Sequence, residues 1–373
     1  MTTAVRRALT DWTFLAPVLA AVVLGLTWGR DLPYGAAGAV GVFLVAAVLA
    51  AVHHAEVVAE RVGEPFGALI LAVAVTVIEV GLIVTLMVTG DEDKTATLAR
   101  DTVFAAVMIT LNGIVGLSLL TAALRRRVAT FNAEGTGGAL ATVATLATLS
   151  LVFPTFTTSE PGPQFSGSQL AFAAVASLAL YGLFVLVQTV RHRDDFLPID
   201  TDNNVVDTDT DTDTDGHGET PSNRQAWRAL ALLLVALIGV VGLAKVDSPA
   251  IEDGVAAAGF PHSAVGVVIA LLVLLPETLA AVRSSRRGQV QISLNLGYGS
   301  AMASIGLTIP VIALASIWLD GPLVLGLEPT QMVLLALSVV VGVLTVIPGR
   351  ATLLQAGVHL ALLSAFIFLA LNP

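Results

Sequence analysis

The stretch that decides the fold is GEPFGALILAVAVTVIEVGLIVTLM, which runs from Gly63 to Met87. An apolar run of about 20 residues is long enough to cross the hydrocarbon core of a bilayer as a helix. Glu64 stands at the start of this run, and a second carboxylate, Glu79, lies near its middle. A second run, LLVLLPETLAAVR from Leu271 to Arg283, contains another acidic residue, Glu277. The two runs predict membrane-spanning helices that each hold an acidic side chain deep in the bilayer.

The composition of the whole chain agrees with this prediction. Of its 373 residues, 55% are apolar and only 12% are charged, whereas a soluble protein has about 25% charged residues. So few charges exclude a soluble enzyme, a nucleic-acid-binding protein and a disordered scaffold. The chain contains no cysteine, which excludes disulfides and thiolate metal sites. We therefore expect a polytopic membrane protein.

Eleven apolar runs have the length of a membrane span, which predicts an all-α protein of eleven transmembrane helices. The run after Glu79 and the run after Glu277 are both rich in small and polar residues. This likeness predicts one extra N-terminal helix followed by two inverted five-helix repeats. The predicted spans are 12–29, 34–53, 66–89, 101–122, 139–157, 168–190, 227–244, 262–283, 290–318, 328–347 and 351–371.

The basic residues predict the orientation of the spans. With the N-terminus in the cytoplasm, 14 of the 18 Lys and Arg residues lie in cytoplasmic loops or span ends. We expect a multi-pass protein of the cell inner (plasma) membrane, with a cytoplasmic N-terminus and an outside C-terminus. The predicted domains are residues 1–30 (extra helix), 31–190 (first repeat), 191–226 (cytoplasmic linker) and 227–373 (second repeat).

The predicted linker is strongly acidic and of low complexity. Asp and Thr alternate from Asp207 to Asp215, with nothing apolar to bury, which is typical of a solvated tether. Asp211, Asp213, Asp215 and Gly216 match the opening of an EF-hand calcium loop. However, Ser222 stands where that loop needs a bidentate glutamate, so we expect no EF-hand here.

Glu79 and Glu277 are the candidate functional residues. A carboxylate at this depth is costly, and within the spans no Lys or Arg pairs with Glu79. Burial favours the neutral form of such a group unless a cation binds it. Two carboxylates facing one cavity are neutralised equally well by two protons or by one divalent cation. This charge balance is that of an antiporter, which needs no resident cofactor.

A hard cation also requires neutral oxygen ligands. Thr76 lies three residues before Glu79 and therefore on the same helical face. Pro276 lacks an N–H, which leaves the carbonyl of Leu272 without its helical donor. The polar residues of the two following spans are further candidates. We predict that the cation site comprises these side chains: Glu79, Glu277, Thr76, Asn112 and Ser300, with Asn295 and Ser304 as weaker candidates.

The segments GEPFGALILAVAVTVIEV (Gly63–Val80) and LLPETLAAVRSSRRGQVQISLNLGYGSAMASIGLTIP (Leu274–Pro310) resemble the two signature repeats of the cation/calcium exchanger superfamily. They are most similar to its bacterial calcium/proton and sodium-potassium/proton antiporter branch. The resemblance implies that one glutamate of each repeat coordinates the cation and exchanges protons. It also implies that Asn112 and Ser300 add ligands, and that the long first helix of each repeat moves as the gate. The sequence departs from the Gly-Asn-x-x-Glu pattern of calcium exchangers, since Val75-Thr76 and Val273-Leu274 precede the glutamates.

We therefore expect a secondary active cation/proton antiporter, not an enzyme. Its partners are the lipid bilayer, protons and the transported cation, and no nucleic acid. Calcium is the leading substrate, because two carboxylates match a divalent charge; Na⁺ or K⁺ exchanged for H⁺ is the alternative. A passive cation channel, from another class, would need a continuous polar pore.

Three histidines, His53, His54 and His359, lie in or beside the predicted spans. His53 and His54 belong, with Glu56, Glu60 and Glu64, to a polar patch at one end of the second predicted span. The patch is either a pH sensor and cation funnel or an ordinary solvated helix end. His359, inside the last span, is expected to be a hydrogen-bonded packing residue.

Overall fold

The structure is a computed structural model of residues 1–373. It describes every residue except 1–10, 31, 64–65, 90–95, 199–220 and 319–320. The Asp–Thr repeat and Glu64 therefore lie outside the described residues. The described chain forms these elements in order: α2 (Trp12–Thr27), α3 (Tyr34–Val62), α4 (Phe66–Thr89), α6 (Leu98–Met108), η1 (Ile109–Ile114), α7 (Val115–Arg126), β1 (Val128–Thr130), α8 (Ala133–Ala147), η2 (Thr148–Val152), η3 (Phe153–Thr155), α9 (Gly167–Leu186), η4 (Val187–Arg191), η5 (Arg193–Phe196), α10 (Asn223–Ala257), α11 (Ala264–Arg286), α12 (Val290–Ala315), α13 (Pro329–Val346), β2 (Arg350–Thr352) and α14 (Leu353–Leu371).

The helices confirm the predicted membrane bundle. Ten helical segments of the described chain are long and apolar enough to span a bilayer, and α2 is a shorter apolar helix of 16 residues. Each coincides with one of the predicted apolar runs. Helix α10 is much longer than its predicted span, with 35 residues. The predicted span ends at Ala244 because charged residues follow it. The helix itself continues to Ala257, since charged residues do not interrupt helical backbone hydrogen bonds.

A small two-stranded ribbon that was not predicted accompanies the helices. Strand β1 pairs antiparallel with β2, with Ala129 opposite Ala351. The ribbon joins the α7–α8 connection to the α13–α14 connection. Strands of three residues are too short to show a two-residue periodicity, so the sequence gives no signal for them.

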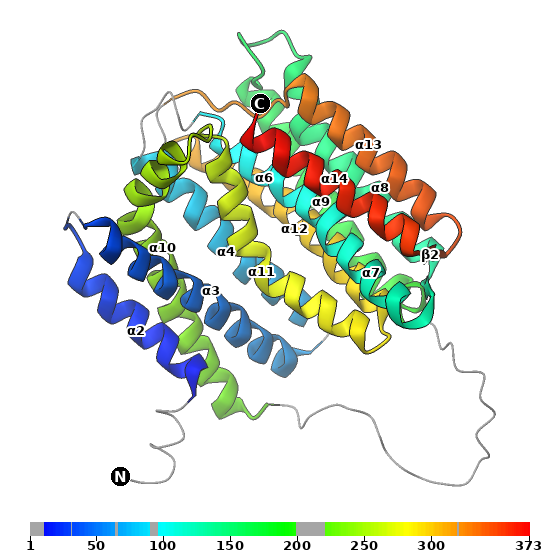
Figure 1. The fold of residues 1–373 in the computed structure, drawn as a ribbon, viewed down its shortest axis with the longest axis horizontal. Helices are drawn as coiled ribbons and strands as arrows, with labels where there is room; N and C mark the ends of the chain where they lie inside the picture. The colour runs from blue at the N-terminus through cyan, green and yellow to red at the C-terminus, as the bar shows by residue number, and fades with distance from the viewer. Residues whose placement is uncertain (1–10, 31, 64–65, 90–95, 199–220, 319–320) are drawn as a thin grey trace.

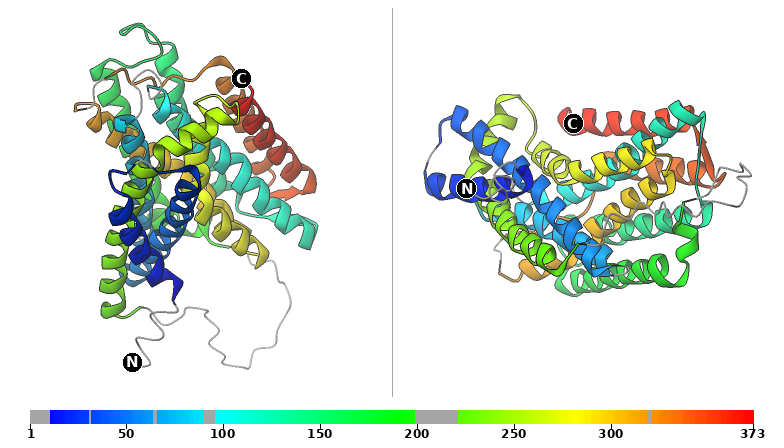
Figure 2. Two further views of the ribbon diagram at one scale, coloured as in Figure 1. Left: turned by 60° about the vertical axis from the view of Figure 1, so that its left-hand side comes forward. Right: turned by 90° about the horizontal axis from the view of Figure 1, so that it is seen from below.

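The helices form two groups that meet at the centre of the bundle. Helices α2, α3 and α10 lie on one side, while α7, α8, α9, α13 and α14 lie on the other (Figure 1). Helices α4, α6, α11 and α12 run between them, and Figure 2 shows the same arrangement from two further directions. One hydrophobic cluster fills the α3–α4–α10 region and a second fills the rest of the bundle.

Glycines allow the central helices to approach closely. A Cβ atom on Gly81 of α4 would lie 2.6 Å from Cγ2 of Val241 in α10, which is closer than atoms can pack. A Cβ on Gly266 of α11 would lie 2.9 Å from the backbone of α6 at Asp101. The residues of α6 are all buried, and the span Leu98–Arg126 that contains it is the most enclosed of the candidate spans.

We call the end of the bundle at which α3, α9 and α11 finish the linker end, because η5 (Arg193–Phe196) and the start of α10 (Asn223–Ala257) lie there (Figure 1). The opposite end, where α14 finishes, is called the C-terminal end. Helices α4, α10 and α12 begin at the linker end and run toward the C-terminal end. The division of these helices into two inverted repeats stays a prediction.

Candidate functional site

A cavity of about 330 Å³ lies among α4, α9, α11 and α12 and contains both predicted glutamates in its wall. It begins at the middle of α4 and α11. It extends toward the linker end, where Gln188 and Thr189 of η4 and Ile292 of α12 also line it. The sequence separates Glu79 and Glu277 by almost 200 positions, and the fold brings them to one space.

The Glu79 side chain is held by one hydrogen bond. Its residue is only 3% exposed, and its Oε1 atom accepts a 2.6 Å hydrogen bond from Ser304 Oγ. The donor comes from α12, so this bond joins the two halves of the chain. Thr76, one turn before Glu79, is buried and lines the same cavity.

The Glu277 side chain has an unmatched oxygen. The residue is 7% exposed, and its Oε2 atom has no hydrogen-bond partner. Among the described residues, no Lys or Arg forms an ion pair with Glu277 or Glu79. This includes Arg283, which follows Glu277 on the same helix. The charge of Glu79 acts on Glu277, and so does that of Glu56 from α3. The cavity therefore concentrates carboxylate oxygens without a basic residue to balance them.

The neutral candidates on α12 all line the cavity, as predicted. They are Ser300, Ser304 and Asn295. The Asn295 amide is already engaged, since Nδ2 donates to the Phe196 carbonyl at 2.7 Å and Oδ1 accepts from Gln291 at 2.9 Å. The hydroxyl groups are thus the simpler additional ligands.

Asn112 does not line the cavity. It lies fully buried in the π-helical turn η1, where Nδ2 donates a 2.9 Å hydrogen bond to Ser338 Oγ. Its Oδ1 faces His359 Nδ1 at 3.3 Å, and His359 Nε2 lies 3.1 Å from Thr345 Oγ1. A π-helical turn changes the face on which later residues emerge, relative to an α-helix. The structure thus joins Asn112 to α13 and α14, and His359 is a buried, hydrogen-bonded residue.

The histidine patch separates into two parts. His54 is buried, and its Nε2 lies 2.9 Å from the backbone carbonyl of Thr13 in α2. His53 stacks near Trp12, with 6.3 Å between ring centroids. Both histidines therefore contact α2, while Glu56 is the member of the patch that acts on Glu277.

The side of the cavity wall that α9 and η4 form was not predicted from the sequence. Tyr181, Phe184, Gln188 and Thr189 come from the final turns of α9 and from η4. Gln188 and Thr189 are two polar residues at the end of an apolar run. This polarity is the only sequence feature that could have indicated their place in the cavity wall. The aromatic residues gave none, because aromatic residues are common throughout packed spans.

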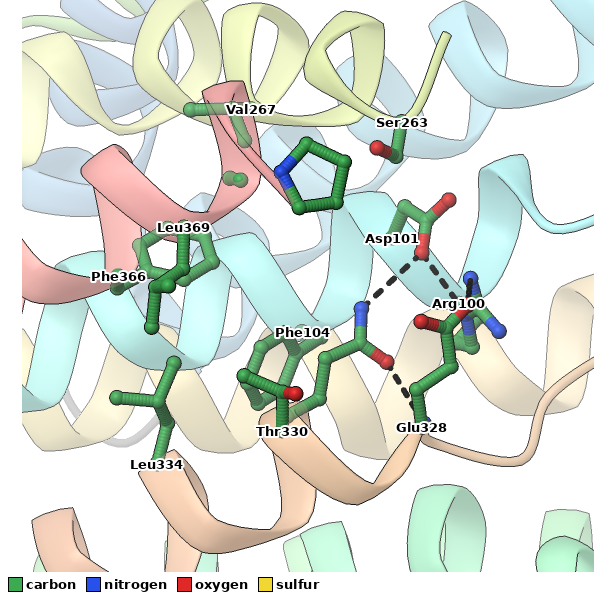
Figure 3. A pocket seen from close by; sticks show the side chains of 13 residues that line it. Arg100, Asp101, Phe104, Ser263, Val267, Glu328, Thr330, Leu334, Phe366 and Leu369 are labelled. Carbon is green, nitrogen blue, oxygen red and sulfur yellow. Dashed lines mark hydrogen bonds and ion pairs between the residues drawn. The ribbon is translucent and has the colours of Figure 1, made fainter. Parts of the chain in front are cut away.

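A second cavity lies at the C-terminal end, with Arg100 and Asp101 in its wall (Figure 3). Arg100 comes directly before the predicted span 101–122, at a span end, but it is only 4% exposed. Its Nε donates to Asp101 Oδ1 at 2.8 Å, and one terminal nitrogen donates to Glu328 Oε1 at 3.2 Å. Thr97 and Gln331 also donate to Asp101. This cluster is internally paired, in contrast to the glutamates of the first cavity.

The sequence matches the model of the sodium/calcium exchanger protein family over residues 33–190 and 228–372. The chain belongs to this family. The two matched segments leave out the acidic linker. Two relatives are alike over nearly their whole length. The ionic transporter y4hA of Sinorhizobium fredii is 44% identical over 369 residues, covering 97% of this chain and 96% of the relative.

The second relative is the sodium-potassium/proton antiporter ChaA of Escherichia coli. It is 34% identical over 361 residues, covering 96% of this chain and 95% of the relative. Solved structures show the same fold. Native YfkE aligns with a TM-score of 0.71 at 14% identity, over 97% of this chain and 100% of that chain. The H⁺/Ca²⁺ exchanger CAX gives a TM-score of 0.65 at 14% identity, over 97% and 94% of the two chains.

Proposed function

We propose that this protein is a secondary active cation/proton antiporter in which Glu79 and Glu277 alternately bind protons and the transported cation. The observation that carries the proposal is the pair of buried carboxylates in one cavity without a basic partner among the described residues. Family membership supports it, and so does the name of the 34% identical relative.

The charge of the pair supplies the coupling. With both glutamates ionised and no cation bound, the cavity carries two negative charges in surroundings of low dielectric, which is unfavourable. Two protons neutralise the pair, and so does one divalent cation. The protein can therefore change its open side when it carries protons or cation, but not when the pair is bare. Because of this restriction, one flux drives the other.

The geometry suggests how a cation would be held. Glu277 Oε2 is available as a ligand, since nothing else engages it. Glu79 would contribute its second carboxylate oxygen while Oε1 keeps its hydrogen bond from Ser304. Ser300 and Thr76 add hydroxyl oxygens from opposite walls. Hard cations prefer such oxygen sets, and no resident cofactor takes part.

Calcium is the first candidate substrate, because its two charges match the two carboxylates. Na⁺ or K⁺ is the second candidate, and the observation that favours it is the sodium-potassium/proton antiporter named among the relatives. With a monovalent cation bound, one of the two glutamates would keep its proton.

The proposed location is the cell inner (plasma) membrane, with the N-terminus in the cytoplasm and the C-terminus outside. In this orientation the linker end faces the cytoplasm, and so does the end of the cavity that Gln188 and Thr189 line. The two long helices α3 and α10 are the proposed moving elements, and they would move relative to the rest of the bundle.

The test is exchange by the purified full-length protein in proteoliposomes with a preset pH gradient. We expect the gradient to collapse only when Ca²⁺, Na⁺ or K⁺ is added, and the most effective of the three identifies the substrate. Glu79→Gln and Glu277→Gln should each abolish this response, while Glu134→Gln, on the exposed start of α8, should not. Cation flux that does not move protons would identify a channel instead.

A further inference from the structure

Another carboxylate, which unlike Asp101 forms no ion pair with a described residue, lies buried within the bundle, outside the cavity. Asp247 of α10 is 6% exposed, and its Oδ1 atom has no hydrogen-bond partner. Its other oxygen, Oδ2, faces Gly41 of α3. A Cβ atom on Gly41 would lie 3.2 Å from it, so the glycine makes room for the carboxylate.

The position of Asp247 relative to the glutamates follows from helix geometry. Helices α4 and α10 both run from the linker end, and they touch where Gly81 meets Val241. Glu79 lies two residues before Gly81, and Asp247 lies six residues after Val241. At 1.5 Å per residue, Asp247 is about 12 Å beyond Glu79 toward the C-terminal end. The cavity lining extends in the other direction, to Gln188 and Thr189, so Asp247 lies on the opposite side of Glu79 from that part of the cavity.

The turn that holds Asp247 presents several oxygen atoms. Pro249 lies inside α10 and has no N–H, so the carbonyl of Lys245, four residues earlier, loses its helical donor. Ser248 Oγ donates a 3.3 Å hydrogen bond to Glu252 Oε1. A carboxylate, an unmatched carbonyl and a hydroxyl on one helical turn are the ligand types that hard cations use.

A purely structural role does not account for Asp247. A buried carboxylate that stabilises a fold is normally paired or fully hydrogen-bonded, because desolvation is otherwise not offset. The nearest cation along the helix is Lys245, but its Nζ lies 5.1 Å from the centre of the Trp28 ring. Asp247 forms no ion pair with any described residue.

Helix α3 offers a counterpart on the other side of the glutamates. Glu56 acts electrostatically on Glu277, and its own neighbours include His53, Glu60 and Arg283 near the linker end. The packed pair α3 and α10 thus carries one carboxylate toward each end of the bundle.

We propose that Asp247 is a cation-binding carboxylate on the access path between Glu79 and the C-terminal end of the bundle. This inference rests on the proposed antiport. The transported cation would bind there briefly before or after it reaches the glutamate pair. One carboxylate with neutral oxygens makes a weak site, as passage requires.

The test measures exchange from each face separately, in right-side-out and inside-out membrane vesicles that contain the full-length protein. The readout is the concentration of the transported cation that gives half-maximal exchange. For Asp247→Asn we expect roughly a tenfold or greater increase at the C-terminal face and a change within about twofold at the linker face. Asp253→Asn, which alters an exposed aspartate on the same helix, is the matched control and should match the wild type at both faces.

Gly41→Ala is a second variant that keeps the carboxylate and crowds it. It should raise the cation concentration for half-maximal exchange at the C-terminal face only. If Asp247→Asn does not fold, this variant still tests the proposal. Equal effects at both faces, or no effect at either in a folded variant, would overturn the inference. If the wild type shows no cation-driven proton flux at all, the proposed antiport fails independently of Asp247.

Discussion

The hydrogen bond from Ser304 to Glu79 sets how readily Glu79 loses its proton. A donor at 2.6 Å favours the ionised carboxylate over the protonated one, and hydrogen bonds to charged groups contribute about 1.5–3 kcal/mol. In Ser304→Ala that contribution is lost, so the proton binds more tightly. Because one pH unit corresponds to about 1.4 kcal/mol, the pH of half-maximal exchange should rise by about one to two units.

The assay is cation-induced proton release from proteoliposomes, measured at saturating cation across a range of pH values. Ser300→Ala is the matched control, because Ser300 lines the same cavity on the same helix but forms no hydrogen bond with Glu79. It should leave the pH profile in place while weakening the apparent affinity for the cation. A profile that stays unchanged in Ser304→Ala, or moves to lower pH, would refute this account of Glu79.

Three further outcomes are expected. Arg100→Ala should lower the free energy of unfolding by about 3–5 kcal/mol, seen as a lower melting temperature in detergent, because it leaves Asp101 buried without its cation; a melting temperature equal to the wild type would contradict the burial. Asn112→Leu should also destabilise the protein but leave the apparent cation affinity within about twofold, since the amide bonds Ser338 outside the cavity. A large loss of affinity would instead restore Asn112 as a ligand. Gly266→Leu should prevent accumulation of folded protein, measured by gel filtration, because no side chain fits against α6 there.

The sequence predicted those features that depend on one helix at a time. Apolar runs located the spans, since a bilayer fixes their length. Glu79 and Glu277 could be singled out because a charged residue inside an apolar run is conspicuous. Thr76 followed from its helical spacing to Glu79, and Ser300 from its polarity within the next span and from the family resemblance; both line the cavity.

Features that depend on irregular backbone or on neighbours could not be predicted in this way. Asn112 was a candidate because it is a polar residue within a span, but it lies in a π-helical turn and bonds to Ser338 outside the cavity. Arg100 looked like a residue at the membrane surface because its partner Glu328 is more than 200 positions away. The ribbon between β1 and β2 likewise depends on two distant connections.

The enclosed position of the span Leu98–Arg126 has a consequence for biosynthesis. This span is synthesised with the first half of the chain, yet α6 packs extensively on α11 and α12 from the second half. Until those helices are inserted, lipid must cover the face that they later bury. The span is apolar, with a mean hydropathy of 2.2 over its most apolar 18 residues, so it is stable in lipid before the second half is inserted. In the complete fold, 89% of this window is buried inside the protein. Assembly therefore requires that protein replace lipid around this helix once the second half of the chain is inserted.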